Sequence, residues 1–353
     1  MKIFKNINKS FLSILFFVLN IGILVFLILT DKDLKQNPMP GIGNFNHYII
    51  FIAVIFMLLY MFMDIIKTYI LIKFYTGRKM IWLSIKTTVI GKYYDNITPT
   101  TTGGQPFQIQ TLRNKDISGI HSSGIILIKF FMFQAVFFVY GFMSLLINII
   151  FDVKYDVFLY IAFAISLSLN FIIPCIVYYL ATHKHTTGRI MYFFLIIGEK
   201  LHIIKSKKKT IRKLLNLSSK FSSTFDLLKK NKRKLITIVI LTFAEIAFFL
   251  LIPFILYIGY NPGIITNPNF IWTFGNFMCS YLFIYFVMSI FPLPGGTGAA
   301  EFGFKWLMAG LFFDETITAI VLWRGITYYL PLVIGLFFII HNVIGKFKSS
   351  RPQ

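Results

Sequence analysis

Two glycine-containing breaks interrupt apolar stretches of the chain, and they hold the residues best suited to binding chemistry. Residues 98–106 read TPTTTGGQP, and residues 291–301 read FPLPGGTGAAE. Each break contains proline, then a Gly-Gly pair, then a polar residue that opens a second helical stretch. A break in hydrocarbon leaves backbone N–H and C=O groups without partners, at roughly several kcal/mol each. A matched pair therefore predicts backbone that lines a covered or water-filled cavity, as in a transport-type site.

The chemistry expected at the breaks is the binding of an anion. A helix that begins after Gly-Gly directs free N–H groups and a positive dipole end into the cavity, which suits the phosphate group of a lipid. The predicted binding residues are Thr98, Pro99, Thr101, Thr102, Gly103, Gly104, Gln105 and Arg113 in the first segment, with Pro294, Gly295, Gly296, Thr297, Gly298 and Glu301 in the second. Two simpler interpretations stay open. In the first interpretation, the breaks are packing kinks at which helices cross closely. In the second, Glu301 and Lys305 form an i, i+4 pair within one helix and bind no ligand.

Ionisable residues inside the apolar stretches form a second group of candidates, because buried charge in a membrane is costly and usually functional. Glu245 has no partner nearby in sequence, and Arg324 lies a few residues into its stretch. Each is predicted to bind a headgroup or a coupling ion, or the two pair with each other. Asp64 and Lys67 have the i, i+3 spacing of a structural pair, and Lys129 is placed to reach the interface.

The composition indicates an integral membrane protein. The chain has 57% hydrophobic and 14% charged residues, whereas soluble domains carry about 25% charged residues. Its 353 residues suffice for about 6–8 spanning helices of about 20 residues and leave no room for a sizeable soluble catalytic domain. No nucleotide-binding, Rossmann, GxSxG or HExxH pattern occurs. We therefore predict no catalytic residues, no cofactor and no metal site.

The net charge of +22 falls in clusters between apolar stretches. That pattern favours membrane orientation and anionic headgroups over a nucleic-acid partner. The basic residues place both termini in the cytoplasm, with the chain crossing the cell membrane several times. The predicted spans are residues 11–30, 48–72, 124–151, 157–181, 235–260 and 316–344.

The broken segments fit this orientation as an inverted pair. Residues 81–120 start and end on the cytoplasmic side, and residues 270–313 start and end outside, so each is predicted to enter and return as a re-entrant helical hairpin. Two full crossings in place of each hairpin leave the ends unchanged, and residues 270–291 are long enough to span. The expected fold is an all-α polytopic membrane bundle with about six spanning helices and two inverted re-entrant hairpins.

The chain is predicted to be one membrane domain over residues 1–353. Its first half is residues 10–182, with the break at 98–106, and its second half is residues 235–345, with the break at 291–301. The basic segment 183–234 between them holds 15 Lys and Arg from Lys184 to Lys234. This segment reads as a basic amphipathic helix on the inner leaflet, or as a solvated loop whose charge enforces topology. A scaffold that recruits a cytoplasmic enzyme through it is a further interpretation.

At its two breaks, with Pro292-Leu293-Pro294-Gly295-Gly296 as the more specific motif, the sequence resembles the lysylphosphatidylglycerol synthase transmembrane region. This is the flippase-like module of bacterial multiple peptide resistance factors and their stand-alone relatives. The resemblance covers residues from about 10 to 345. It implies movement of an anionic or aminoacylated phospholipid such as lysylphosphatidylglycerol, in lipid metabolism linked to antibiotic resistance.

In full-length members, a separate soluble domain transfers lysine to the lipid. The chain ends at Gln353, so that transfer chemistry is not expected from this chain alone. The alternative to a lipid translocase is that the protein is the membrane component of a phosphatidylglycerol lysyltransferase. Its transferase domain would then be a separate cytoplasmic partner. The lipid, the coupling ion and the oligomeric state stay open.

Overall fold

The computed structural model of the chain describes residues 45–98, 103–182, 224–291 and 293–349. Every regular element in these residues is helical, which confirms the predicted all-α fold. The predicted first span at 11–30 lies outside the described residues. So does most of the basic segment 183–234, of which the structure describes residues 224–234.

Six described helices are long and apolar enough to cross a membrane, and the protein is a multi-pass membrane protein. They are α3 (Tyr48–Thr76), α6 (Gly119–Phe151), α7 (Val157–Thr182), α10 (Lys232–Tyr260), α11 (Phe270–Ile290) and the continuous run of α13 (Thr316–Arg324), a π-helical turn (Gly325–Tyr329) and α14 (Leu330–Ser349). Five of them coincide with predicted spans. The sixth, α11, was predicted as one arm of a hairpin whose length suits a span.

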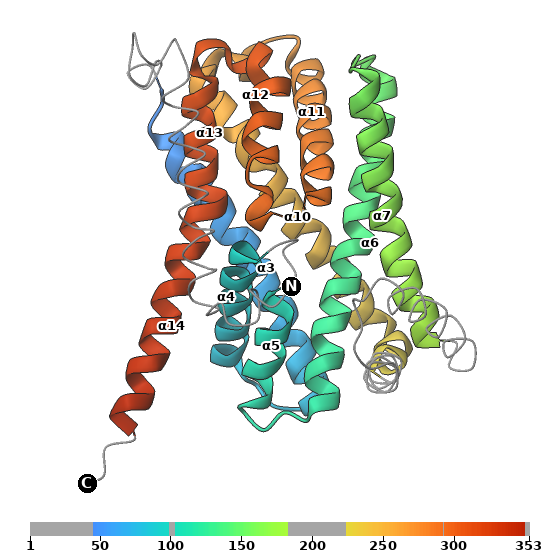
Figure 1. The fold of residues 1–353 in the computed structure, drawn as a ribbon, viewed down its shortest axis with the longest axis vertical. Helices are drawn as coiled ribbons and strands as arrows, with labels where there is room; N and C mark the ends of the chain where they lie inside the picture. The colour runs from blue at the N-terminus through green and yellow to red at the C-terminus, as the bar shows by residue number, and fades with distance from the viewer. Residues whose placement is uncertain (1–44, 99–102, 183–223, 292, 350–353) are drawn as a thin grey trace, which may run out of the picture.

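Two helix pairs join at the predicted breaks. The first pair is α4 (Ile81–Ile97) and α5 (Gly104–Arg113). The second is α11 and α12 (Ala299–Phe312), with a short 3-10 turn (Pro294–Gly296) at the break. In Figure 1, α4 and α5 lie together in the lower half of the molecule, and α11 and α12 lie together in the upper half. The two pairs therefore enter from opposite ends, as expected for inverted hairpins.

Aromatic and small residues bring the helices together around these pairs. Phe137 on α6 stacks on Phe286 on α11, with ring centroids 4.1 Å apart. Gly141 permits this approach, since a Cβ there would lie 2.3 Å from the Phe286 ring. Large apolar side chains such as Phe51 and Ile149 are exposed, as expected for surfaces that face lipid.

The last span contains an irregularity next to a predicted site residue. The π-helical turn begins directly after Arg324, and π-helical turns inside α-helices occur frequently at functional sites. Tyr328 in this turn donates a hydrogen bond to the carbonyl oxygen of Asn96 at 3.2 Å, and the Asn96 amide donates to the carbonyl oxygen of Tyr328 at 3.3 Å. These reciprocal bonds fasten the end of α4 to the last span.

Candidate functional site

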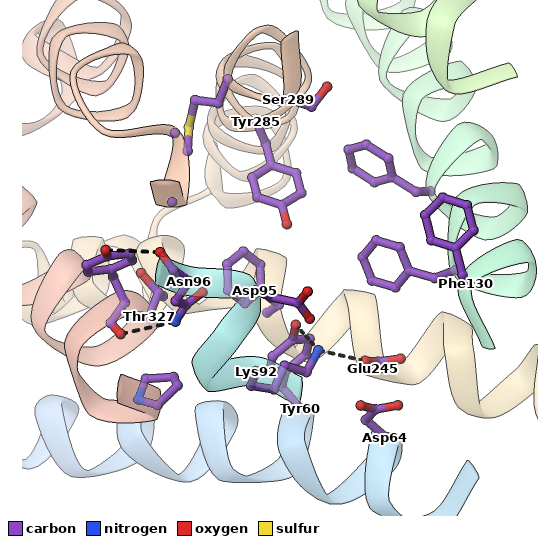
Figure 2. A pocket seen from close by; sticks show the side chains of 18 of the residues that line it. Tyr60, Asp64, Lys92, Asp95, Asn96, Phe130, Glu245, Tyr285, Ser289 and Thr327 are labelled. Carbon is purple, nitrogen blue, oxygen red and sulfur yellow. Dashed lines mark hydrogen bonds and ion pairs between the residues drawn. The ribbon is translucent and has the colours of Figure 1, made fainter. Parts of the chain in front are cut away.

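A cavity of about 590 Å³ lies where the two hairpin tips approach each other. Contacts between α4 and the turn at Pro294–Gly296 bring the first pair against the second break. The lining includes five of the residues that the sequence predicted to bind a ligand, namely Gln105, Glu245, Gly295, Gly296 and Arg324. Figure 2 shows side chains from several helices converging on this space.

Five charged side chains form an alternating chain at one side of the cavity. Lys92 on α4 lies 3.4 Å from Glu245 on α10, which in turn pairs with Lys67 on α3. The Lys67 ammonium lies 3.7 Å from Asp64, and the Lys129 ammonium on α6 lies 2.9 Å from the same carboxylate. Along this row of ion pairs the charges alternate in sign, with a lysine at each end, Lys92 and Lys129.

Further polar groups hold the two terminal lysines. Lys129 donates to the hydroxyl of Thr68 at 2.7 Å, and Lys92 donates to the hydroxyl of Tyr60. The side chains of Lys67 and Glu245 are 2% and 1% exposed. Replacing a buried ion-pair network by apolar residues is often neutral or stabilising, so this cluster is poorly explained by stability alone.

A second charged cluster closes the tip of the α11–α12 pair. Glu301 accepts the N–H of Gly298 at 2.6 Å with one oxygen, and the Arg324 Nε lies 2.7 Å from the other. Arg324 Nη1 donates to the carbonyl oxygen of Gly295 at 3.0 Å. The Nε contact is an ion pair whose N–H is not aligned for a hydrogen bond, and Nη2 has no hydrogen-bond partner within the described residues. A buried guanidinium beside the cavity therefore has a donor nitrogen that no described protein group satisfies.

The two tips use glycine for different reasons. In the second, Gly295 and Gly298 have φ values of +60° and +85°, which residues with a Cβ rarely adopt. In the first, Gly104 has no such φ but approaches α4 closely. A Cβ there would lie 2.3 Å from the carbonyl oxygen of Gly91 and 2.6 Å from a carboxylate oxygen of Asp95.

Protein side chains already occupy the N–H groups at the start of both returning helices. The N–H of Gly104 donates to Asp95 at 2.9 Å, and that of Gly103 donates to the hydroxyl of Thr98 at 2.9 Å. The N–H of Gly298 is held by Glu301 in the same way. These groups were predicted to face a phosphate, and in this structure they bind a carboxylate or hydroxyl of the chain itself.

Apart from Lys129, the residues of α6 and α7 that line the cavity are uncharged. This wall combines aromatic side chains, Phe130, Phe133 and Phe137, with the amides of Gln134 and Asn170. Gln134 donates to Asn170 at 3.2 Å, and Asn170 donates to Ser289 on α11 at 3.2 Å. One side of the cavity thus presents charges and the other presents rings and neutral hydrogen-bonding groups. Such a division suits an amphiphilic ligand.

Comparison with known protein families assigns the chain to one family. The family model described as "Lysylphosphatidylglycerol synthase TM region" matches residues 10–335. The chain belongs to this family. The match includes both breaks and every described residue that lines the cavity. No curated protein and no solved structure matches the chain.

The remaining predicted residues of this family member lie at defined places. Thr98, Gly103 and Gly104 form the first tip behind the cavity wall, and Thr297 is fully buried at the second tip. Arg113 is exposed in the last turn of α5, away from the cavity lining. Pro294 belongs to the 3-10 turn. Three predicted site residues of the first break lie outside the described residues: Pro99, Thr101 and Thr102.

Two alternatives that the sequence left open are now decided by distances. Glu245 and Arg324 do not pair with each other, since Glu245 binds two lysines and Arg324 binds Glu301. Lys129 does not extend to the interface but is 7% exposed beside Asp64.

Sequence reasoning missed several residues that line the cavity, among them Tyr60, Lys92 and Asp95. The available signal was the polar run Lys92-Tyr93-Tyr94-Asp95-Asn96 directly before the first break. Spacing along one helix does not show which of its residues meets a partner on another helix, so this signal alone does not select Lys92 or Asp95.

Proposed function

We propose that the protein is a lipid translocase that binds the headgroup of an anionic or aminoacylated phospholipid, such as lysylphosphatidylglycerol, and moves it between leaflets. The observation that carries the proposal is the convergence of both hairpin tips on one charged cavity of about 590 Å³. Two helix breaks from opposite ends meeting at one site is the arrangement found in transporters built from inverted repeats. The family membership supports a membrane protein of this kind.

The charged side of the cavity suits the phosphate. Lys92 and Lys129 end the alternating chain, and each carries an ammonium that a phosphate oxygen can share. The Arg324 Nη2 adds a donor without a hydrogen-bond partner in the described chain. Guanidinium and ammonium groups bind phosphate oxygens through charge-assisted hydrogen bonds.

The uncharged wall suits the rest of the lipid. Phe130, Phe133 and Phe137 offer apolar surface where acyl chains leave the headgroup. Gln134 and Asn170 offer neutral donors and acceptors to glycerol or ester oxygens. An apolar wall that continues into the membrane lets the chains stay in hydrocarbon while only the headgroup enters the protein.

We propose that the end of the molecule carrying α4 and α5 faces the cytoplasm. The connection after α3 contains Arg78 and Lys79, and the connection after α5 contains Lys115. Both connections and the C-terminal end of α14 lie at the bottom of Figure 1. Short cytoplasmic loops carry an excess of Lys and Arg, and this supports a cytoplasmic position for that end of the molecule.

Proteoliposomes test the translocase directly. Fluorescently labelled phosphatidylglycerol is incorporated in both leaflets, and a membrane-impermeant quencher reports how much reaches the outside. Protein-containing vesicles should lose nearly all fluorescence, whereas empty vesicles lose about half. Glu245→Gln should slow the exchange, because it removes the carboxylate shared by Lys67 and Lys92. Asp152→Asn serves as the matched control, since Asp152 is exposed and lies far from the cavity.

Equal quenching with and without the protein, across anionic, aminoacylated and zwitterionic lipids, refutes the translocase. Folded protein must be verified by size-exclusion chromatography before that comparison.

A second candidate function follows from the word synthase in the family description. The protein would then be the membrane component of a phosphatidylglycerol lysyltransferase and would work with a separate cytoplasmic transferase. Loss of lysyl-lipid from cells in which only this gene is deleted supports that function. Unchanged lysyl-lipid content, with an altered distribution between leaflets, supports the translocase instead.

A further inference from the structure

The charges around the cavity balance one another. The cations are Lys67, Lys92, Lys129 and Arg324, and the carboxylates are Asp64, Asp95, Glu245 and Glu301. Three of the four carboxylates are in ion pairs. Asp95 is in none among the residues that the structure describes, and within them its carboxylate accepts one hydrogen bond, from the N–H of Gly104. With all eight groups ionised, the net charge is zero.

Asp95 occupies a distinct position in this set. It lies in the last turn of α4 and lines the cavity, and Figure 2 shows its carboxylate directed into the open space between α4 and Phe130. One carboxylate oxygen accepts the N–H of Gly104, the first residue of α5, at 2.9 Å. Asp95 thus links the cavity to the tip of the first hairpin.

The charged groups around Asp95 come from every side of the cavity, and each of them has a partner of its own. On its own helix, the Lys92 ammonium is held by Tyr60 and Glu245. From α3 and α6, Asp64 and Lys129 face each other. The last span contributes Arg324, which pairs with Glu301 of α12. Helix α10 contributes Glu245, which pairs with Lys67 of α3. Protonation of any other carboxylate would break an ion pair, whereas protonation of Asp95 breaks none.

Binding a lipid phosphate disturbs this balance. The headgroup of a lipid without amino groups, such as phosphatidylglycerol, is a phosphodiester monoanion, and its entry gives the cavity a net charge of −1 in a region of low dielectric, where an uncompensated charge is strongly disfavoured. Uptake of one proton restores neutrality. Because both events involve the same cavity, their free energies are linked in both directions.

We propose that Asp95 is a proton-binding residue that takes up one proton when a phosphodiester monoanion enters the cavity and releases it when the anion leaves. The proton adds to a carboxylate oxygen, and no covalent bond is broken. This inference rests on the proposed lipid function and assigns its coupling ion. It makes anion movement through the cavity responsive to a pH difference across the membrane.

Protonation also acts on the hairpin. Hydrogen bonds to an ionised acceptor are about twice as strong as those between neutral groups. A neutral Asp95 therefore holds the Gly104 N–H less tightly and loosens the junction of α4 and α5. Loading of the cavity with anion and proton together would then coincide with greater freedom of the first hairpin tip.

Proton uptake on binding is the direct test. Short-chain dihexanoyl phosphatidylglycerol is titrated into the purified full-length protein in an uncharged detergent, and the heat is measured in two buffers that differ in ionisation enthalpy. The wild type should take up about one proton for each lipid bound at a pH where Asp95 is ionised. Asp95→Asn should bind the lipid with no proton uptake, and Asp152→Asn should behave as the wild type. Inorganic phosphate, titrated in parallel, distinguishes a lipid site from a general phosphate site.

The outcomes separate this inference from the proposed function. Lipid binding and leaflet exchange by the wild type without proton uptake overturn the role of Asp95 and leave the translocase standing. Proton uptake that persists in Asp95→Asn also overturns it. Failure of the wild type to bind any phosphate-containing probe overturns both. In vesicles, an imposed pH gradient should change the exchange rate of the wild type and of Asp152→Asn, and it should not change that of Asp95→Asn.

Discussion

The ion pair between Glu301 and Arg324 allows the hairpin tip to be tested by a double-mutant cycle. The Arg324 Nε lies 2.7 Å from Glu301, and the two side chains are 4% and 1% exposed. Glu301 also holds the N–H of Gly298, and Arg324 holds the carbonyl oxygen of Gly295. The pair therefore fixes both ends of the Gly295–Gly298 turn.

Removing one charge leaves the other buried without a counter-charge. Glu301→Gln keeps the volume of the side chain but strands the guanidinium, and Arg324→Met strands the carboxylate. Each should lower the free energy of unfolding by about 3–5 kcal/mol. The double variant has no stranded charge and loses hydrogen bonds of about 1 kcal/mol each, so it should lose only about 1–3 kcal/mol. The two single losses together should exceed the double loss by at least about 3 kcal/mol.

The assay is reversible unfolding in mixed micelles, with increasing mole fraction of sodium dodecyl sulfate. Tryptophan fluorescence is a suitable probe because Trp323 is buried beside Arg324. All four proteins are measured at the same protein and micelle concentrations. Additive losses, or a double variant less stable than either single variant, would refute the pairing and with it the proposed architecture of the second tip.

Two further predictions concern packing and the alternating charges. Gly141→Ala should lower the free energy of unfolding by about 1–3 kcal/mol in the same assay, because the new Cβ would lie 2.3 Å from the Phe286 ring. The control is Gly310→Ala, where no atom lies within 4 Å of the new Cβ, and it should leave the free energy of unfolding unchanged or raise it by up to about 1 kcal/mol. Equal effects at the two glycines would contradict the close contact between α6 and α11. Lys129→Met should lower the free energy of unfolding by about 3–5 kcal/mol, because Asp64 loses the ammonium 2.9 Å away. This loss should be the same at low and high salt, since buried ion pairs are screened little.

Much of the fold follows from hydropathy and charge alone. Five of the predicted spans coincide with helices of the structure, and their ends differ by only a few residues, as α3 shows by continuing past Ile72 to Thr76. The uninterrupted apolar runs dictate this outcome, because a backbone in lipid must satisfy its own hydrogen bonds. The assignment of α11 was harder, since 21 residues suit either a hairpin arm or a crossing.

The candidate site was predictable in part. The breaks marked Gly295 and Gly296, and burial cost marked Glu245 and Arg324, and all four line one cavity. The partners of these residues were not predictable. Glu245 meets Lys92 across 153 positions of sequence, and such a contact depends on how the helices rotate and cross, which periodicity within one helix does not determine.

The hairpin tips satisfy one physical requirement in two ways, and the comparison indicates what the breaks are for. A helix start in a membrane has N–H groups that need acceptors. At the first tip the acceptor Asp95 comes from the helix before the break, and at the second the acceptor Glu301 comes from the helix after it.

If the breaks served mainly to present backbone N–H groups to a phosphate, a carboxylate at each position would oppose binding. The geometry favours another purpose. The breaks end α4 and α11 inside the molecule. Charged side chains of α4 and of the last span thereby meet at one place, whereas unbroken helices would carry them past each other. Substitutions at Lys92, Lys129 and Arg324 should therefore alter lipid binding more than substitutions that perturb the capped N–H groups, and a binding series across both sets would decide between the two purposes.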